Sequence, residues 1–336
     1  MAREQVARAV DAGLVALHWE VGRRICDEVL HQTRAAYGAE IVSTVSRQLE
    51  PEFGRGFSEK SLRHMIRFAE VFPRREIVST LSRTLAWSHF LEIIYQEDAL
   101  AHDFYAEMCR LERWSVRALR DKIGSMLFER TALSRKPEEL AERELAKLRE
   151  GDILSPDLVF RDPYLLNFLG LHDSYSEKDL EAAILREMES FILELGAGFT
   201  FVARQKRIVI DGEDFYLDLL FYHRKLRRLV AIDLKLERFQ AADKGQMELY
   251  LRWLAKYEME PGEEAPIGLI LCEDSGAEQV ELLQLDQSGI RVASYLTDLP
   301  PKAVLQKKLR AAADLARQRL ENEPAPMEGE SGENQN

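Results

Sequence analysis

The chain has 336 residues, of which 46% are hydrophobic and 31% charged, and its formal net charge at pH 7 is -12. Such a composition is typical of a globular protein, and the length is sufficient for two domains. The acidic balance does not favour nucleic-acid binding, although a local basic face would still permit it. Three isolated cysteines argue against a zinc site or a disulfide framework. Without a signal-peptide core or a membrane-length apolar run, we expect a cytoplasmic protein with no membrane partner.

Residues 1–130 are predicted to form a helical domain. A glycine-containing link precedes Ser58, a good N-cap for a helix with apolar residues at helical spacing. Helix, turn and helix together are typical of a helix-turn-helix, and its basic side chains Arg55, Arg63 and Arg67 would then contact nucleic acid. An ordinary helical bundle with solvated arginines explains the same pattern equally well, because acidic residues dilute the basic face.

The remaining residues are predicted to form a connector, a region of helices and strands, and a C-terminal helix with a tail. Residues 131–155 are rich in Ala, Glu, Lys and Arg and are predicted to form a helical or mobile connector. In residues 156–300 helices alternate with strands. One helix should extend from Ser176 to Leu195, with Glu181 on its packed side, and be followed by separate short strands at 199–202 and 206–210. A C-terminal helix over residues 301–320 and a disordered acidic tail over 321–336 are expected to follow.

A predicted β-hairpin is the most informative stretch. Residues 215–222 and 229–236 are rich in β-branched, aromatic and leucine residues and are joined by a short basic turn. If the centre of the turn is the midpoint of this polar link, Asp218 lies directly opposite Asp233 on the same face of the hairpin. Opposed carboxylates repel each other, whereas a hard cation would convert them into a pair of ligands. A half-exposed hairpin with charges on its wet face is the simpler interpretation.

The order of these polar residues resembles the PD-(D/E)xK nuclease superfamily. Glu181 lies on a helix, Asp218 on a strand, and Asp233-Leu234-Lys235 on the next strand, while Gln246 and Tyr250 share a face of the following helix. The chain resembles the bacterial YhcG-type family more closely. The strings that support this are Trp19-Glu20-Val21-Gly22-Arg23, Phe53-Gly54-Arg55-Gly56-Phe57-Ser58, Trp87-Ser88-His89, Trp114-Ser115-Val116-Arg117, Arg204-Gln205, Asp214-Phe215-Tyr216-Leu217-Asp218-Leu219-Leu220-Phe221-Tyr222-His223 and Ile232-Asp233-Leu234-Lys235.

The resemblance implies an α+β or α/β chain, in which a helical, helix-turn-helix-like domain precedes a restriction-endonuclease-like mixed sheet flanked by helices. It also implies a metal-dependent nuclease of the restriction, repair or Holliday-resolvase type. Mg²⁺, for which Mn²⁺ could substitute, would be held by Asp218 and Asp233, and by Glu181 either directly or through water, with the backbone carbonyl of Leu234 as a further ligand. Lys235 would position or help deprotonate the attacking water, and Gln246 and Tyr250 would orient the site.

The expected macromolecular partner is DNA, and no small-molecule cofactor is expected. The phosphate backbone would be held by Arg204, Lys206, Arg224, Lys225, Arg227 and Arg228. Because nucleases that cut two strands are often dimers, a homodimer is considered, although the sequence does not fix the oligomer. The alternative function is a non-cleaving module that keeps the nuclease fold and binds nucleic acid or protein.

Overall fold

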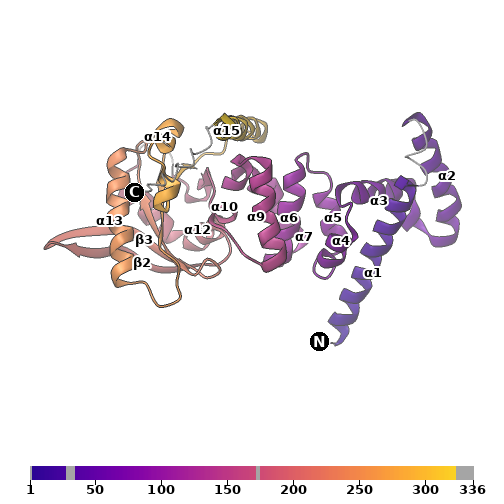
Figure 1. Cartoon of the computed structure of the whole chain (residues 1–336), viewed down its shortest axis with the longest axis horizontal. Coiled ribbons are helices and arrows are strands. Elements are labelled where there is room, and N and C mark those ends of the chain that lie inside the picture. Colours follow the sequence, from indigo (N-terminus) through magenta and orange to yellow (C-terminus); the bar gives the residue numbers. More distant parts are fainter. Residues whose placement is uncertain (1, 28–34, 172–174, 323–336) are drawn as a thin grey trace, which may run out of the picture. The chain divides into compact units, whose positions relative to one another are not determined.

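The computed structural model describes residues 2–27, 35–171 and 175–322, and its chain divides into two compact units (Figure 1). Unit 1 comprises residues 1–128 and 142–153, and unit 2 comprises residues 129–141 and 154–336. The chain therefore passes from one unit to the other three times. The stretch expected to form a single connector is shared between the units, and the tail after residue 322 lies outside the described residues.

Unit 1 is helical, as the sequence predicts. Ser58 caps α3 by accepting a hydrogen bond from the amide of Ser61 (3.4 Å), and the apolar stripe of α3 is buried. The second helix continues through Pro51 to Phe53, although a proline usually ends or kinks a helix. The helices of this unit are α1 (Ala2–Ile25), α2 (Ala35–Phe53), η2 (Arg55–Phe57), α3 (Glu59–Val71), α4 (Arg75–Leu81), α5 (Trp87–Ile93), α6 (Ala99–Glu112), α7 (Val116–Gly124), α8 (Leu127–Arg130, which ends in unit 2) and most of α9 (Glu138–Gly151).

Two close contacts hold the helices of unit 1 together. A Cβ atom added at Gly22 of α1 would lie 1.9 Å from the carbonyl oxygen of Met65 in α3, so these helices can approach this closely only at a glycine. The second contact surrounds the fully buried carboxylate of Glu107 in α6. Glu107 accepts hydrogen bonds from Arg110 (2.8 Å) and from Arg149 of α9 (2.7 Å), so its buried charge is compensated on both oxygens.

Unit 2 is built on a mixed six-stranded sheet with the order β1-β6-β5-β4-β3-β2. The pairs β2–β3 and β3–β4 are antiparallel, whereas β4, β5, β6 and β1 run parallel. The strands are β1 (Tyr164–Leu165), β2 (Phe199–Ile210), β3 (Glu213–His223), β4 (Arg228–Leu234), β5 (Ile267–Cys272) and β6 (Ile290–Leu296). This sheet confirms the predicted architecture, although the two-residue β1 is too short to show a sequence signal.

Helices cover both faces of the sheet, and the alternation of side chains along β3 shows which helix covers which face. Phe221 packs against Phe191 of α12, while Leu220, the adjacent residue, belongs to the core cluster of Met247 and Leu254 in α13. The expected single helix from Ser176 to Leu195 is two helices, because the backbone leaves the helical region at Glu187. The helices of unit 2 are η3 (Ala132–Arg135), α10 (Pro156–Val159), η4 (Asn167–Leu169), α11 (Glu177–Arg186), α12 (Met188–Leu195), α13 (Ala241–Tyr257), α14 (Ala277–Leu282), η5 (Leu285–Ser288) and α15 (Lys302–Asn322).

The edge strand β2 is continuous, which corrects the expectation of two short strands at 199–202 and 206–210. The ladder to β3 shifts register between Phe201 and Ala203, and Gln205 has a φ of 44°. A left-handed residue inside a strand costs about 1–3 kcal/mol and persists only where its surroundings require it. The irregular backbone explains why the sequence pattern breaks there, and Figure 1 shows the β2–β3 hairpin extending past α13.

The turn between β3 and β4 is anchored by a buried histidine. The side chain of His223 is fully buried, and its Nδ1 accepts a hydrogen bond from the amide of Leu226 (3.0 Å). Burial lowers the pKa of His223 to about 4. The imidazole is therefore neutral in the folded protein at physiological pH.

Candidate active site

The β3–β4 hairpin has the predicted register, and its ladder ends at the two aspartates. Leu219 pairs with Ile232 and His223 pairs with Arg228, which is the register deduced from the centre of the turn. Beyond Leu219 the strands are joined differently, because Asp218 Oδ2 accepts a hydrogen bond from the backbone amide of Leu234 (2.8 Å). The carboxylate of Asp218 thus takes the place of a backbone acceptor at the end of the ladder.

Asp233 is almost completely buried, and its main charged partner is Lys235. Asp233 Oδ2 lies 2.9 Å from Lys235 Nζ. Burial raises the pKa of Asp233 to about 6, and the nearby Asp218 carboxylate adds to this rise while Lys235 opposes it. For Lys235 itself, burial lowers the pKa, but the attraction to Asp233 outweighs burial and leaves the pKa above its usual value.

Glu181 of α11 is connected to Asp218 of β3 through one side chain of β2. The Nε2 of Gln205 donates to Glu181 Oε2 (2.9 Å) and to Asp218 Oδ1 (3.0 Å). Burial, reinforced by the negative charge of Asp218, raises the pKa of Glu181 despite the hydrogen bond from Gln205. Three elements that are separate in the sequence therefore meet at one polar cluster, as the order of motifs predicted for Glu181 and Asp218.

The predicted Gln246 and Tyr250 pair also reaches this cluster. Lys235 Nζ donates to Gln246 Oε1 (3.4 Å), Gln246 Nε2 donates to the hydroxyl of Tyr250 (2.7 Å), and that hydroxyl donates to the backbone carbonyl of Tyr216 (3.2 Å). Burial raises the pKa of Tyr250, so its hydroxyl keeps its proton and remains a donor. The chain of hydrogen bonds fixes Lys235 from α13 and gives the side-chain amide of Gln246 one partner at its oxygen and one at its nitrogen.

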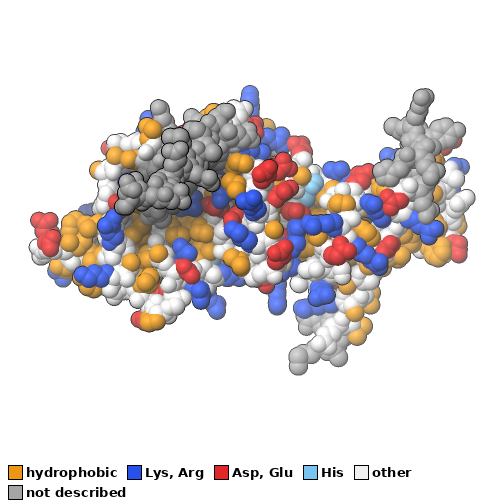
Figure 2. All heavy atoms as spheres, in the orientation of Figure 1, with side chains coloured by type: hydrophobic (Ala, Val, Ile, Leu, Met, Phe, Trp, Pro, Cys, Tyr) orange, Lys and Arg blue, Asp and Glu red, His pale blue; other side chains and the backbone are white. Residues whose placement is uncertain are grey.

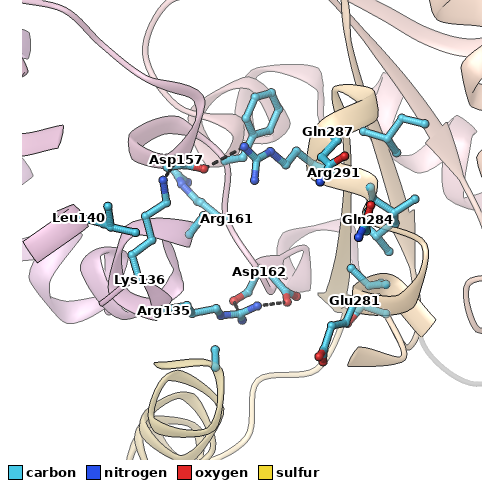
Figure 3. Close-up of a pocket in the computed structure, with 18 residues that line it drawn as sticks. Arg135, Lys136, Leu140, Asp157, Arg161, Asp162, Glu281, Gln284, Gln287 and Arg291 are labelled. Carbon is cyan, nitrogen blue, oxygen red and sulfur yellow. Dashed lines mark hydrogen bonds and ion pairs between the residues drawn. The ribbon is translucent and has the colours of Figure 1, made fainter. Parts of the chain in front are cut away.

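Of two hollows formed by described residues of unit 2, one includes a residue of the predicted site. A hollow of about 460 Å³ opens beside Lys235 and is also lined by the first turn of α11 and the segment that leads into α13. The other, of about 580 Å³, lies between η3, α10, α14 and β6. Five of its charged residues are paired with one another: Lys136 and Arg291 bind Asp157, and Arg135 binds Asp162 (Figure 3). These paired charges are accounted for as structural ion pairs.

The predicted nucleic-acid contacts of unit 2 are dispersed. Arg204 is exposed on β2 next to Gln205, and its charge acts on Glu181. Lys206 is ion-paired with Glu258, the C-cap residue of α13 (2.7 Å). The basic turn lies at the opposite end of the hairpin, five residues or about 17 Å of strand from Asp218. Within the turn region, Arg224 and Lys225 are exposed, whereas Arg227 contacts Glu264 and Arg228 donates to the carbonyl of Ala265.

The basic residues predicted to contact nucleic acid in unit 1 lie on or next to α3. Arg55 is exposed in η2, Arg63 is paired with Glu59, and Arg67 contacts Glu70 and the carbonyl of Ile94. On the face drawn in Figure 2, Lys and Arg side chains alternate with Asp and Glu. This face does not present a single large basic patch.

Gln205 is the residue that sequence reasoning missed. It stands in the Arg204-Gln205 string that contributes to the family resemblance, but no role was predicted for it. Its contacts depend on the irregular backbone of β2, which no local sequence pattern indicates. Leu234 contacts the site through its amide N–H, whereas the predicted metal contact of its carbonyl oxygen stays a prediction.

The donor atoms of the predicted metal ligands are of the type that a hard divalent cation prefers. Glu181, Asp218 and Asp233 supply only oxygen donors, as Mg²⁺ prefers, and their mutual repulsion would be relieved by positive charge. Among residues 2–27, 35–171 and 175–322, however, no three His, Cys, Asp or Glu side chains lie close enough together to hold a metal ion as they stand. Direct ligation by these carboxylates therefore requires them to converge further.

The mixed sheet and its Glu, Asp and Asp-x-Lys residues define a PD-(D/E)xK nuclease domain. Comparison with known families agrees, since residues 157–310 match the model described as "YhcG PDDEXK nuclease domain" and residues 1–130 match the "DUF1016 N-terminal domain". The chain is 35% identical over 339 residues to the Escherichia coli (strain K12) protein named "Putative nuclease YhcG", covering 92% of this chain and 90% of that protein. The chain belongs to the YhcG family, which confirms the resemblance.

Comparison with solved structures finds two that match part of the chain. A repair endonuclease from Pyrococcus abyssi is 21% identical with a TM-score of 0.26, and the match covers 39% of this chain and 50% of that one. The structure of EndoMS in apo form is 20% identical with a TM-score of 0.25, covering 39% and 49%. The chain thus spans about half the length of each. Separately, no helix in the described part of the chain is long and apolar enough to cross a membrane.

Proposed function

We propose that this protein is a divalent-cation-dependent nuclease that hydrolyses phosphodiester bonds of DNA. The observation that supports this most directly is the convergence of Glu181, Asp218, Asp233 and Lys235 from three separate elements at the end of the β3–β4 ladder. Asp233 is buried and Glu181 and Asp218 are half-buried, and the charge of Asp218 acts unfavourably on both of the other carboxylates. Such an arrangement beside a fixed lysine is costly for stability, so it is better explained by chemistry.

The three carboxylates would hold Mg²⁺ or, in its place, Mn²⁺, with the carbonyl of Leu234 as a further ligand. When bound, the cation would supply Lewis acidity for the attacking water and neutralise charge on the phosphate. Lys235, held by Asp233 and Gln246, would hold the water in line with the phosphorus. Tyr250 would act indirectly, by fixing the orientation of Gln246.

Cleavage assays on the full chain test this proposal. Linear duplex, single-stranded and branched DNA, with RNA as a comparison, would be incubated with Mg²⁺, Mn²⁺ or no divalent cation. We expect cation-dependent cleavage that is lost in Asp233→Asn and in Lys235→Ala. Lys244→Ala is a matched control, because Lys244 is about as exposed as Lys235 and is likewise ion-paired, here with Glu248. Lys244→Ala should cleave as the wild type does.

The two classes of variant should differ in cation binding. Asp233→Asn should weaken binding of Mn²⁺ in calorimetry, whereas Lys235→Ala should still bind it, because Lys235 is not a ligand. If the wild type binds DNA but cleaves it in none of these conditions, the proposal is contradicted and the non-cleaving module is supported. Cleavage that is equally fast without divalent cations would contradict the role of the carboxylates.

The DNA contacts are part of the proposal and can be located by salt dependence. Each phosphate neutralised on duplex DNA adds about 0.9 to the slope of log affinity against log salt. Replacing Arg204 by Ala should reduce this slope, because Arg204 is exposed beside the carboxylate cluster. Replacing Arg224 and Lys225 tests the distant turn separately, and replacing Arg63 tests α3. If none of these changes the slope, the binding face lies elsewhere. Sedimentation of the DNA complex would show whether a homodimer is the active form.

A further inference from the structure

Gln205 combines two features that are unusual for a glutamine in an edge strand. Its backbone lies in the left-handed region, with a φ of 44°, where glycine and asparagine are much more readily accommodated. The ladder pairs Arg204 with Leu219 and Lys206 with Leu217, so Gln205 lies opposite Asp218 between two paired positions. The strained backbone thus directs this side chain to the carboxylate cluster.

The side-chain amide of Gln205 joins two carboxylates that belong to different elements. Its Nε2 donates to Glu181 Oε2 on α11 and to Asp218 Oδ1 on β3, at 2.9 and 3.0 Å. Each carboxylate oxygen has two acceptor sites, so a hydrogen bond to one of them leaves the carboxylate able to bind a cation. The second oxygen of Asp218 is oriented by the amide of Leu234. Together these contacts fix the direction in which both carboxylates face.

A purely structural role explains these features poorly. Gln205 is exposed on an edge strand, so its replacement would remove no buried apolar surface and open no cavity. Asparagine would suit the left-handed backbone better than glutamine does, but it is shorter by one methylene group, about 1.5 Å. From the same backbone position an asparagine amide could not reach both carboxylates within hydrogen-bonding distance. The length of glutamine is therefore required for the bridge and not for the strand.

We propose that Gln205 is a positioning residue that holds Glu181 and Asp218 together as the paired oxygen donors for the divalent cation of the nuclease. This inference rests on the proposed function, since it concerns the same carboxylates. Groups that orient metal ligands typically contribute 10- to 100-fold to metal affinity. The cation affinity, and not the chemical step itself, is therefore the property that Gln205 should control.

The test compares Gln205→Asn and Gln205→Ala with the wild type by calorimetry with Mn²⁺ on the full chain. We expect both variants to bind Mn²⁺ about 10- to 100-fold more weakly. Without metal, the melting temperature of Gln205→Asn should stay close to that of the wild type, because the better fit of asparagine to the left-handed backbone offsets the exposed hydrogen bonds that are lost. In cleavage assays a higher Mn²⁺ concentration should restore the rate of Gln205→Asn to the wild-type plateau, whereas Lys235→Ala should stay inactive.

A matched control is Gln96→Asn in unit 1, because the amide of Gln96 also donates a hydrogen bond, to the carbonyl of Glu92. This variant should bind Mn²⁺ as the wild type does. Unchanged Mn²⁺ affinity in Gln205→Asn would overturn the positioning role while leaving the proposed function intact. Tighter binding would also overturn it, by showing that the amide competes with the cation. A wild-type chain that binds neither Mn²⁺ nor Mg²⁺ would overturn both proposals together.

Discussion

Replacing Asp218 by asparagine should destabilise unit 2 in the absence of metal. The opposed-carboxylate pattern alone predicts the reverse, because a neutral side chain relieves repulsion worth about 0.2–1 kcal/mol for a cross-strand pair. The structure adds an opposing contribution. Asp218 accepts hydrogen bonds from the Leu234 amide through one oxygen and from Gln205 through the other. Asparagine has one acceptor oxygen, so one of these donors would face an NH₂ group.

The two contributions can be compared in size. A hydrogen bond to a charged group contributes about 1.5–3 kcal/mol to stability. Subtracting the relieved repulsion leaves a net loss of about 1–2 kcal/mol. For a domain of this size, each kcal/mol corresponds to roughly 2–4 °C in melting temperature. We therefore expect the transition of unit 2 to fall by roughly 2–8 °C.

Scanning calorimetry of the metal-free protein measures this change, and the two units can be followed as separate transitions if they unfold independently. Asp214→Asn is the matched control, because Asp214 lies on the same strand but is exposed and paired with Arg207. The control should leave the transition of unit 2 unchanged. A melting temperature of Asp218→Asn equal to or above that of the wild type would refute the reasoning, because repulsion would then exceed the hydrogen bond to the backbone.

Three further predictions concern the fold. His223→Asn should flatten the pH dependence of stability. Because the pKa of His223 in the folded protein is about 4, the neutral side chain contributes fully to stability above the unfolded pKa of about 6.5. This contribution falls by about 1 kcal/mol between pH 7.5 and 5.5, as the unfolded chain takes up a proton. Urea titrations of the wild type and the variant at both pH values measure the difference, and parallel pH profiles would contradict it. Gly22→Ala should destabilise unit 1 by about 1–3 kcal/mol or more, because its Cβ would collide with the Met65 carbonyl, and an unchanged urea midpoint would contradict this packing. Glu107→Gln should lower the free energy of unfolding of unit 1 by about 3 kcal/mol, because two guanidinium groups would lose their buried negative partner. Calorimetry measures this loss, and a transition at the wild-type temperature would contradict it.

Regular parts of the fold could be predicted from the sequence because local patterns determine them. The hairpin register follows from period-two alternation and a centred turn, and it placed Leu219 opposite Ile232 correctly. The strand at 267–272 is buried along its whole length, and its sequence is a nearly continuous apolar run. The limits arose where tertiary contacts override local preference. Pro51 lies within a helix instead of ending it, and the helix after Ser176 breaks at Glu187 without a proline or glycine to indicate it.

In the candidate site too, features set by local sequence patterns were predictable and features set by tertiary contacts were not. The order of Glu181, Asp218 and Lys235 along the chain predicts a shared site. The structure places Glu181 on a helix, Asp218 on a strand and Lys235 directly after the next strand. The bridging role of Gln205 was not predictable, since it depends on a single left-handed residue in β2. Several predicted DNA contacts were selected by charge alone, and charge does not determine which end of a strand a residue occupies. The basic turn consequently lies far from Asp218.

The path of the chain between the units bears on how such a protein can be inherited. A protein whose domains are joined by one linker can exchange them by a single recombination event in its gene. Here the chain passes between the units three times, so no single breakpoint separates them cleanly. A break after residue 130 removes Arg149 from the buried Glu107, and a break after residue 153 removes Arg135 from Asp162. The interleaved path therefore favours joint inheritance of the helical unit and the nuclease unit as one gene.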